Sequence, residues 1–432
     1  MKDKVYDTII IGAGPAGASL AYFLSNLNLK IALIEKKKYA DTPVRCAELV
    51  PKALTMLYSD KIKGINNEIS HMETYIEGRL VNVTGSEGYI LDRNIFIDFL
   101  IKEFVKQGGD YLNSTSFLNA SYTDTDENIC GCQTPESSMI NKGSKSHAFH
   151  NTHELYVKIK QKEKIACLKT KILAGADGPC SMVARIMQSL YNDQCEQLKN
   201  YDSKKSFLHE VRENNVNKKS CISAVKENQK KENNFLAGFQ ENILKKNTHE
   251  NHTKIFFYPF IAGGYGWLFP KVNSLNAGIA VNMNILKENG LKNIYSRFKN
   301  ELVKNEIIKG DEYINSAISG LAPVCGIRSR IVKNNIVLIG DAAGLCNPIT
   351  GAGNYNAALS AKIVSEKIKT AIQAQNMEVL KEAEKEINDC FKTSLEHALK
   401  KRQILEKNNT CYDFEHLIKK TWVSFKDYWR ER

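Results

Sequence analysis

The chain has 432 residues, a formal net charge of +12 at pH 7 and an isoelectric point near 9.0. At this length two intimately joined domains are expected rather than one small core. The lysines are scattered through Asn/Lys-rich stretches and no basic helix with interleaved aromatic residues stands out, so the composition argues against nucleic acid as a partner.

The eleven cysteines, an odd number, indicate reduced thiols and a cytoplasmic protein, because no secretory signal pattern precedes them. No stretch approaches the roughly eighteen apolar residues of a membrane span. We therefore expect a soluble protein, or one that lies peripherally at a membrane surface.

The opening segment carries the strongest pattern of the chain. The apolar run Val5–Ile11 is followed by Gly-Ala-Gly-Pro-Ala-Gly, a helical stretch and a second apolar run. Gly12 permits the tight turn, Gly14 lets a diphosphate approach the backbone, and Gly17 lets the helix pack closely on the strands. The helix N-terminus faces the diphosphate. Glu35 ends the second run, where a carboxylate binds the hydroxyls of an adenosine ribose.

Between this motif and the middle of the chain, helical spacing predicts a helix over 94–107, with Asp92 as its cap and Gly108-Gly109 as its stop. β-like pieces follow over 111–175. The polar stretch 124–152 is poor in large apolar residues, so we expect a disordered insertion. Its cysteines and histidines have the atoms for a metal site, but a solvated loop is the favoured interpretation and no metal is predicted. Those residues are Cys130, Cys132, His147, His150 and His153.

A second glycine motif occurs late in the chain, where an apolar strand ends in Gly340-Asp341 and Gly351-Ala352-Gly353 precedes a helix from Asn354 to about Gln373. Asp341 is placed to bind a ribityl hydroxyl or to order a water on the diphosphate. Backbone amides at the helix start can approach a flavin ring edge and stabilise the anion of reduced flavin. The cofactor is therefore expected between segments far apart in sequence.

These elements predict an α/β protein with a Rossmann-like FAD-binding domain, an inserted β-sheet substrate domain and C-terminal helices. The FAD-binding domain is expected from residues 1–110, 160–190 and 330–375. The substrate domain is expected at 191–329 and the C-terminal helical region at 376–432. Aromatic residues of that last region could anchor on an anionic bilayer or pack against the main body. They are Trp422, Phe425, Tyr428 and Trp429.

Both glycine motifs, together with Gly175-Ala176-Asp177-Gly178, resemble those of the flavoprotein group that contains aromatic-ring hydroxylases. Three further segments are similar to the geranylgeranyl reductase family within that group. They are Arg45-Cys46-Ala47-Glu48, the helix start that carries Arg93, and Tyr265-Gly266-Trp267-Leu268-Phe269-Pro270, which matches a Tyr-x-Trp-x-Phe-Pro signature. The resemblance covers roughly residues 5–115 and 164–370.

The resemblance implies FAD as cofactor and a set of contacts to it. Leu49 departs from the family, which has a small glycine there. The candidate catalytic residues are Cys46, Tyr265 and Trp267. With the motif glycines, the candidate cofactor-binding residues are Gly12, Gly14, Ala16, Gly17, Glu35, Arg45, Cys46, Ala47, Leu49, Arg93, Asp177, Gly340, Asp341, Gly351, Gly353 and Asn354.

The activity implied is the saturation of double bonds in a geranylgeranyl chain of a lipid, diphosphate or pigment precursor. An alkene has no polar handle, so its site must be an apolar tunnel over the flavin, and Tyr265, Trp267, Phe269 and Phe257 are candidates to line it. Cys46 either gates the ring or assists proton delivery, or it is a small buried residue whose backbone alone contacts FAD.

Because only one Gly-rich dinucleotide turn is present, NAD(P)H and reduced ferredoxin both remain candidate electron donors. The expected partners are a hydrophobic prenyl-chain substrate, a membrane surface and a small redox protein. The main alternative is a flavin-dependent monooxygenase or hydroxylase of a hydrophobic substrate. A quinone-linked dehydrogenase with an iron–sulfur centre is disfavoured by the lack of a late cysteine cluster. A flavin-binding protein without turnover is the third alternative.

Overall fold

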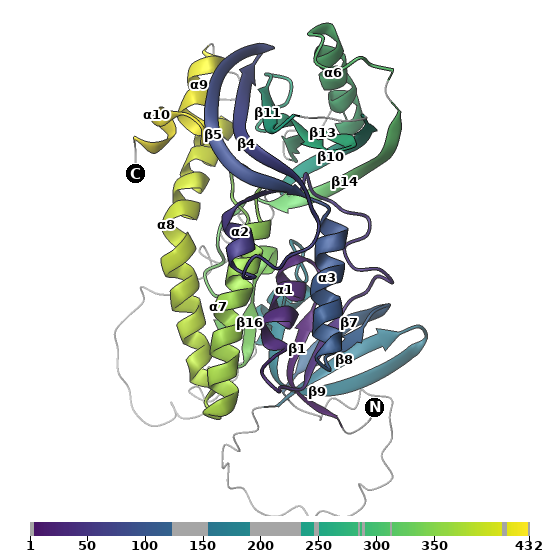
Figure 1. The fold of residues 1–432 in the computed structure, drawn as a ribbon. Coiled ribbons are helices and arrows are strands. Elements are labelled where there is room, and N and C mark those ends of the chain that lie inside the picture. Colours follow the sequence, from purple (N-terminus) through teal and green to yellow (C-terminus); the bar gives the residue numbers. More distant parts are fainter. Residues whose placement is uncertain are drawn as a thin grey trace, which may run out of the picture.

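The computed structural model describes residues 4–122, 154–190, 235–245, 250–283, 286, 290–311, 313–407 and 413–430. The insertion expected at 124–152, with Cys130, Cys132, His147, His150 and His153, lies outside the described residues, as does the first part of the expected substrate domain. Within the described ranges the chain forms two eight-stranded sheets, which lie one above the other in Figure 1.

The first sheet is the predicted dinucleotide-binding sheet. Its main path runs β15-β16-β9-β1-β2-β6, and β1 pairs in parallel with both β2 and β9. A hairpin of β7 and β8 extends it through β9. The strands are β1 (Val5–Ile11), β2 (Ile31–Ile34), β6 (Asp110–Leu112), β7 (Thr115–Ser121), β8 (Leu155–Gln161), β9 (Lys164–Gly175), β15 (Val332–Lys333) and β16 (Ile336–Leu338).

Helices α1 (Pro15–Leu24), α3 (Arg93–Lys106) and α7 (Asn354–Gln373) pack together beside this sheet (Figure 1). Ile9, Ile10 and Ile11 of β1 are consecutive and buried, as expected for a parallel strand with no solvent-facing side on which to alternate. The α/β prediction with a Rossmann-like domain is confirmed.

The second sheet is largely antiparallel and has the order β14-β10-β13-β12-β11-β4-β5-β3. Residues 49–91 belong to it, although their place in the chain had put them in the expected 1–110 segment of the FAD-binding domain. Composition alone does not say which sheet a strand joins. The strands are β3 (Leu49–Pro51), β4 (Ile65–Ile76), β5 (Arg79–Leu91), β10 (Phe235–Leu244), β11 (His252–Phe257), β12 (Tyr265–Lys271), β13 (Ser274–Asn282) and β14 (Ile314–Pro323).

The two faces of the second sheet have different neighbours. Helix α6 (Leu291–Lys304) covers one face, where Phe298 lies so close that a Cβ on Gly266 would be 2.6 Å from its ring. Since successive side chains of a strand point to opposite faces, Tyr265, Trp267 and Phe269 of β12 face the other way. That second face looks toward the cofactor-binding motifs and the C-terminal helices.

The C-terminal region is helical, as predicted. Helix α8 (Leu380–Lys407) runs from beside α7 to the second sheet, where α9 (Phe414–Thr421) and α10 (Lys426–Trp429) follow (Figure 1). Trp422, Phe425 and Tyr428 are buried in the main body, whereas Trp429 is 46% exposed. None of the described helices is long and apolar enough to cross a bilayer. Three short elements are also present: α2 (Ala53–Met56), η1 (Gly340–Ala343) and η2 (Met377–Val379).

Candidate active site

In the first glycine turn, Gly12 and Gly17 lie in close contact with other backbone atoms, whereas Gly14 faces open space. Gly12 has φ +97°, and a Cβ there would lie 2.5 Å from the Ala176 carbonyl oxygen. A Cβ on Gly17 would lie 1.8 Å from the Gly12 carbonyl oxygen. At Gly14, by contrast, no atom lies within 4 Å of the position that a Cβ would take. The N-terminus of α1 therefore opens onto free space in which a diphosphate fits.

Glu35 is fixed against this turn at the end of β2, with 8% of its surface exposed. Its Oε2 accepts the Ala13 N–H at 2.9 Å, and its Oε1 accepts the Lys37 N–H at 2.9 Å. Each carboxylate oxygen has further acceptor capacity, so both can also take a ribose hydroxyl. The carboxylate is thus oriented before any cofactor binds.

We predict that Glu35→Ala weakens FAD binding by about 1.5–3 kcal/mol, roughly 10- to 150-fold in Kd, because a charge-assisted hydrogen bond is lost. Titration of the apoprotein with FAD measures the change. Thermal melting of the two apoproteins serves as the control for folding. An unchanged Kd would contradict the assignment of Glu35 to the ribose.

The second glycine motif meets the first. Gly340, at φ +58°, begins η1, and a Cβ on it would lie 2.8 Å from the Ala16 Cβ. Residues distant in the sequence are therefore packed side by side at the start of α1. This contact needs a glycine for two reasons, the positive φ and the close approach.

Asp341 presents an unsatisfied carboxylate beside this contact. No hydrogen bond from the described residues reaches its oxygens, and a Cβ on Gly353 would lie 3.0 Å from Oδ1. Burial raises the pKa of Asp341 to about 6, against the opposing effect of the Arg93 guanidinium. A desolvated carboxylate without a donor fits a cofactor hydroxyl, so this residue, with the open space at Gly14 and the oriented Glu35, supports a dinucleotide of the FAD type.

The raised pKa of Asp341 predicts a pH-dependent stability. The folded apoprotein holds the proton up to about pH 6, whereas the ordinary pKa of an aspartate in the unfolded chain is 3.8. Stability is therefore lost as pH rises from about 4 to 6, by at most roughly 3 kcal/mol. Asp341→Asn should raise the Tm of the apoprotein more at pH 8 than at pH 4. Equal Tm changes at both pH values would contradict this prediction.

Cys46, Arg93 and Asn354 are brought together by a chain of polar contacts. The Asn354 Nδ2 donates to the Cys46 sulfur at 3.4 Å, and its Oδ1 accepts from Arg93 Nη1 at 3.3 Å. The Cys46 sulfur also accepts the Glu48 N–H at 3.2 Å. The Arg93 guanidinium is held in a bidentate ion pair with Asp41, at 2.6 and 2.7 Å. This network joins the loop before β3 to the N-termini of α3 and α7.

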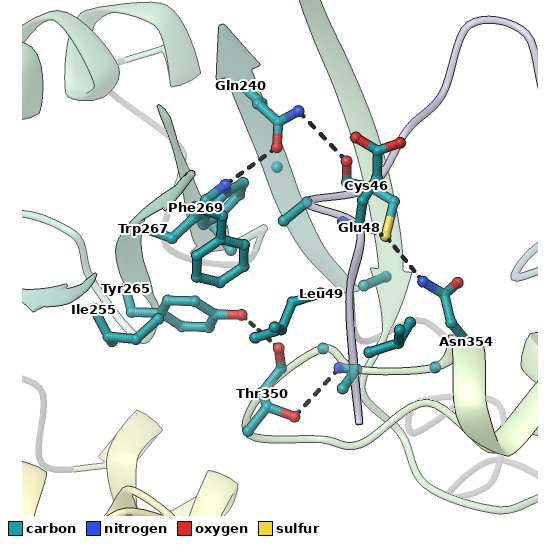
Figure 2. Close-up of a pocket in the computed structure, with 18 of the residues that line it drawn as sticks. Cys46, Glu48, Leu49, Gln240, Ile255, Tyr265, Trp267, Phe269, Thr350 and Asn354 are labelled. Atoms are coloured by element: carbon teal, nitrogen blue, oxygen red, sulfur yellow. Dashed lines mark hydrogen bonds between the residues drawn. The ribbon is translucent and has the colours of Figure 1, made fainter. Parts of the chain in front are cut away.

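An apolar cavity of about 380 Å³ lies where this network meets the second sheet. Figure 2 shows Tyr265, Trp267 and Phe269 on one side, with Leu49 and the loop that carries Thr350 close to them. The Tyr265 hydroxyl donates to the Thr350 carbonyl oxygen. We call this space the apolar cavity. Walls of this kind suit a hydrophobic ligand, with few polar groups to orient it.

Half of the predicted site residues line this cavity. Besides Cys46, six candidates for cofactor contact line it: Arg45, Ala47, Leu49, Gly351, Gly353 and Asn354. Phe257 packs against Tyr265 behind the wall, with ring centroids 6.4 Å apart. Asp177 lies elsewhere and is satisfied by the chain itself. Its carboxylate accepts the N–H groups of Met182 and Val183, which begin the helix at 182–190.

Gln240 and Trp422 are among the cavity-wall residues that were not candidates predicted from the sequence. Gln240 of β10 accepts the Trp267 indole N–H at 3.1 Å and donates to the Cys46 carbonyl oxygen at 3.4 Å (Figure 2). Trp422 lies 4.9 Å from Tyr265 between ring centroids. A single Gln in a strand belongs to no sequence pattern that would predict these two hydrogen bonds. The aromatic pattern after α9 is visible in the sequence, but its place in the cavity wall is not.

The dinucleotide fold, the two joined glycine motifs and the apolar cavity beside them define a flavin-dependent oxidoreductase. Residues 234–319 match the family model of the geranylgeranyl reductase catalytic domain, and residues 10–40 match that of an NAD(P)-binding Rossmann-like domain. The first of these matches confirms the resemblance to geranylgeranyl reductases that the motifs of the chain indicate. Among the described residues, no group of three or more His, Cys, Asp or Glu is arranged to hold a metal.

Similar proteins agree with this assignment. The digeranylgeranylglycerophospholipid reductase of Methanococcus vannielii is 26% identical over 424 residues, which cover 94% of this chain and 88% of the relative. That of Methanocaldococcus jannaschii is 26% identical over 416 residues, with the same coverage. A geranylgeranyl bacteriochlorophyll reductase-like structure from Thermoplasma acidophilum has the same fold, with a TM-score of 0.69, 21% identity and 98% coverage of both chains.

The fold is also shared with a hydroxylase. The structure of aklavinone-11 hydroxylase with FAD and aklavinone aligns with a TM-score of 0.59 and 13% identity, over 95% of this chain and 70% of that one. Fold alone therefore does not separate reduction from hydroxylation. The residues of the site have to do so.

Proposed function

We propose that this protein is an FAD-dependent reductase that saturates carbon–carbon double bonds in the geranylgeranyl chains of a glycerophospholipid. The observation that carries the proposal is the apolar cavity, whose walls come from the aromatic face of β12, from the segment that carries Cys46 and from the loop of the second glycine motif. The names of the relatives supply the class of lipid.

Residues of this chain hold each part of FAD. The open space at Gly14 and the N-terminus of α1 receive the diphosphate, and Glu35 receives the adenosine ribose. Asp341 accepts a ribityl hydroxyl. The N-terminus of α7, at Gly353 and Asn354, lies beside the cavity and stabilises negative charge on the ring. Held by these residues in its reduced form, FAD would supply hydride chemistry for one alkene carbon.

The cavity walls position the prenyl chain and exclude water from the alkene. An alkene cannot be oriented by hydrogen bonds, so rate acceleration depends on the fit of the chain against Tyr265, Trp267 and Phe269. Two groups at the wall are proposed as proton donors. One is the Tyr265 hydroxyl, whose pKa is raised by burial so that it keeps its proton, and the second is the Cys46 thiol. Either proton could be delivered to the second alkene carbon.

The same proposal includes the electron donor and the location. NAD(P)H and reduced ferredoxin are the two donors compatible with a single Gly-rich dinucleotide turn. Because the substrate is a membrane lipid, we place the protein at the cytoplasmic surface of a membrane. The exposed Trp429, on a basic background, is suited to such a surface.

Anaerobic reduction of the purified protein tests the function directly. The flavin is reduced with dithionite, unsaturated geranylgeranyl phospholipid or geranylgeranyl diphosphate is added, and the products are analysed by mass spectrometry. We expect masses that increase in steps of two hydrogens. Unchanged masses for both compounds would reject the proposal. Oxygen uptake coupled to substrate consumption would favour the hydroxylase alternative instead.

We predict that Cys46→Ser keeps the flavin but slows turnover, by up to roughly 10²–10⁴-fold if the thiol delivers the proton. Serine keeps a hydrogen-bonding group beside Asn354, so the loop should retain its position, but its hydroxyl is a much weaker acid than a thiol. Single-turnover oxidation of reduced flavin by the lipid measures the rate, and the flavin spectrum is the control for binding. Wild-type kinetics would leave Cys46 with a packing role only.

A further inference from the structure

A second cavity, of about 520 Å³, adjoins the apolar cavity along the same face of the second sheet. Gln240, Glu48 and Ile318 line both spaces. The second space is rich in carboxamide and hydroxyl side chains, and we call it the polar cavity. Those side chains are Asn66, Asn94, Asn242, Asn273, Asn276, Asn315, Ser274 and Ser316.

The boundary between the two cavities coincides with a change in residue type along each strand. Residues two apart in a strand face the same side of a sheet. On β12 the apolar cavity is lined by Tyr265, Trp267 and Phe269, and the next residue on that face, Lys271, lines the polar cavity. The side chains on one face of the strand therefore change from apolar to polar.

The neighbouring strands change in the same direction. On β10, Gly238 lines the apolar cavity, Gln240 lines both and Asn242 lines the polar cavity. On β14 the corresponding residues are Gly320, Ile318 and Ser316, and β13 changes from Ala280 to Asn276 and Ser274. A change at one level across four strands gives this sheet face an apolar end and a polar end.

The segment that carries Cys46 crosses the sheet at that level. Gln240 donates to the Cys46 carbonyl oxygen, and Asn276 Nδ2 donates to Glu48 Oε2 at 3.0 Å. A Cβ on Gly320 would lie 3.2 Å from the Arg45 Cβ, so the segment rests directly on the strands. The polar cavity is thus adjacent to the proposed reaction site and shares a wall with it.

The chemistry of the polar cavity selects against an anion. Its charged wall residues are Glu48, Asp92 and Lys271, and the Lys271 ammonium lies 2.6 Å from Glu48 and 2.8 Å from Asp92. Two carboxylates around one ammonium leave an excess of negative charge, which repels phosphate. Asparagine carboxamides both donate and accept hydrogen bonds, and so do the hydroxyls of a polyol.

We propose that the polar cavity binds an uncharged polyhydroxyl group, and that the head group of the lipid substrate supplies it while a prenyl chain occupies the apolar cavity. This inference rests on the proposed function. An amphiphilic ligand matches a sheet face that is apolar at one end and hydroxyl-binding at the other. Binding of the head group would then select among lipids that carry the same chains.

Two substitutions in the polar cavity test this assignment. Ser316→Leu fills the cavity without breaking a hydrogen bond, since the described residues make none to its hydroxyl. Asn242→Leu removes a carboxamide that donates to Ser274 and to Asn276 Oδ1, at 3.0 and 2.9 Å. Ser319→Leu is the matched control, because it makes the same change on β14 at a residue that lines neither cavity.

The measurement compares geranylgeranyl phospholipid bearing an inositol head group with geranylgeraniol, which has no polyol. Both cavity variants should raise the KM of the inositol lipid about tenfold or more, and both should leave the KM of geranylgeraniol unchanged. The control should leave both values unchanged. Equal KM changes for the two substrates, or none, would overturn the proposal. Failure of the wild type to reduce both geranylgeraniol and the lipid would instead reject the proposed function.

The second arm identifies the source of the hydroxyl groups. Free inositol is titrated into the wild-type protein and into Ser316→Leu while the intrinsic tryptophan fluorescence is followed. Free inositol that binds the wild type alone, without any preference for the inositol lipid over geranylgeraniol, would assign the cavity to a soluble polyol and overturn the lipid head group as its source. Inositol that competes with the inositol lipid but not with geranylgeraniol would support the proposal.

Discussion

Gly14→Ala should weaken FAD binding by at least about 100-fold while leaving the apoprotein folded, whereas Gly17→Ala should destabilise the fold itself. Gly14 has φ −74° and ψ −170°, a conformation open to any residue, and no atom lies within 4 Å of the added methyl group. That methyl occupies the space into which the diphosphate must come. A Cβ on Gly17 would be only 1.8 Å from the Gly12 carbonyl oxygen, so helix and strand must separate, at a cost of several kcal/mol.

Urea unfolding of the apoproteins and FAD titration separate the two effects. Gly85→Ala is the matched control, since a Cβ there also meets open space, and it should change neither stability nor affinity. Wild-type affinity in Gly14→Ala would show that the diphosphate does not approach this backbone. Wild-type stability in Gly17→Ala would show that the helix tolerates displacement.

Sequence reasoning succeeded where the determining contacts are local. The strand, glycine turn and helix from β1 to α1 are specified by neighbouring residues, and α7 begins at Asn354 and ends at Gln373, as the pattern predicted. In each of these segments, the residues that determine the local backbone geometry are close to one another in the sequence. Such features can be read without knowledge of the rest of the fold.

Features that depend on distant partners could not be read in the same way. Asp92 stands at the N-cap position of α3, as predicted, but its side chain makes no cap hydrogen bond. Its carboxylate instead contacts the Lys271 ammonium and the Asn66 amide. Both residues belong to the second sheet, so the competing interaction has no local signature. The same reason explains why the strands of 49–91 were assigned to the wrong layer.

The apolar cavity contains both residues that could be predicted from the sequence and residues that could not. The Tyr265, Trp267 and Phe269 pattern indicated an apolar wall, because alternate residues of a strand share a face. Gln240 and Trp422 enter that wall from β10 and from the C-terminal region, and their pairing with β12 is set by the sheet order and by helix packing. Side chains that close a cavity are therefore found only after the tertiary structure is known.

Gly238→Leu should reduce kcat/KM for the geranylgeranyl lipid by about 100-fold and shift preference toward shorter prenyl chains. Gly238 lies on the floor of the apolar cavity, and a Cβ there would meet its nearest atoms at 3.7 to 4.0 Å, which is ordinary contact. A leucine is therefore accommodated by the strand but extends into the space proposed for the substrate. The loss corresponds to roughly 2.7 kcal/mol of transition-state binding.

Gly238→Ala provides the graded comparison, because one methyl group should cost much less than a leucine side chain. Flavin affinity and the rate of flavin reduction by dithionite should be the same in both variants, since Gly238 lies in β10 and not in a cofactor motif. Steady-state kinetics with a geranyl and a geranylgeranyl substrate measure the chain-length preference. Equal losses on both substrates would indicate general damage to the site, and full activity on the longer one would show that the chain binds elsewhere.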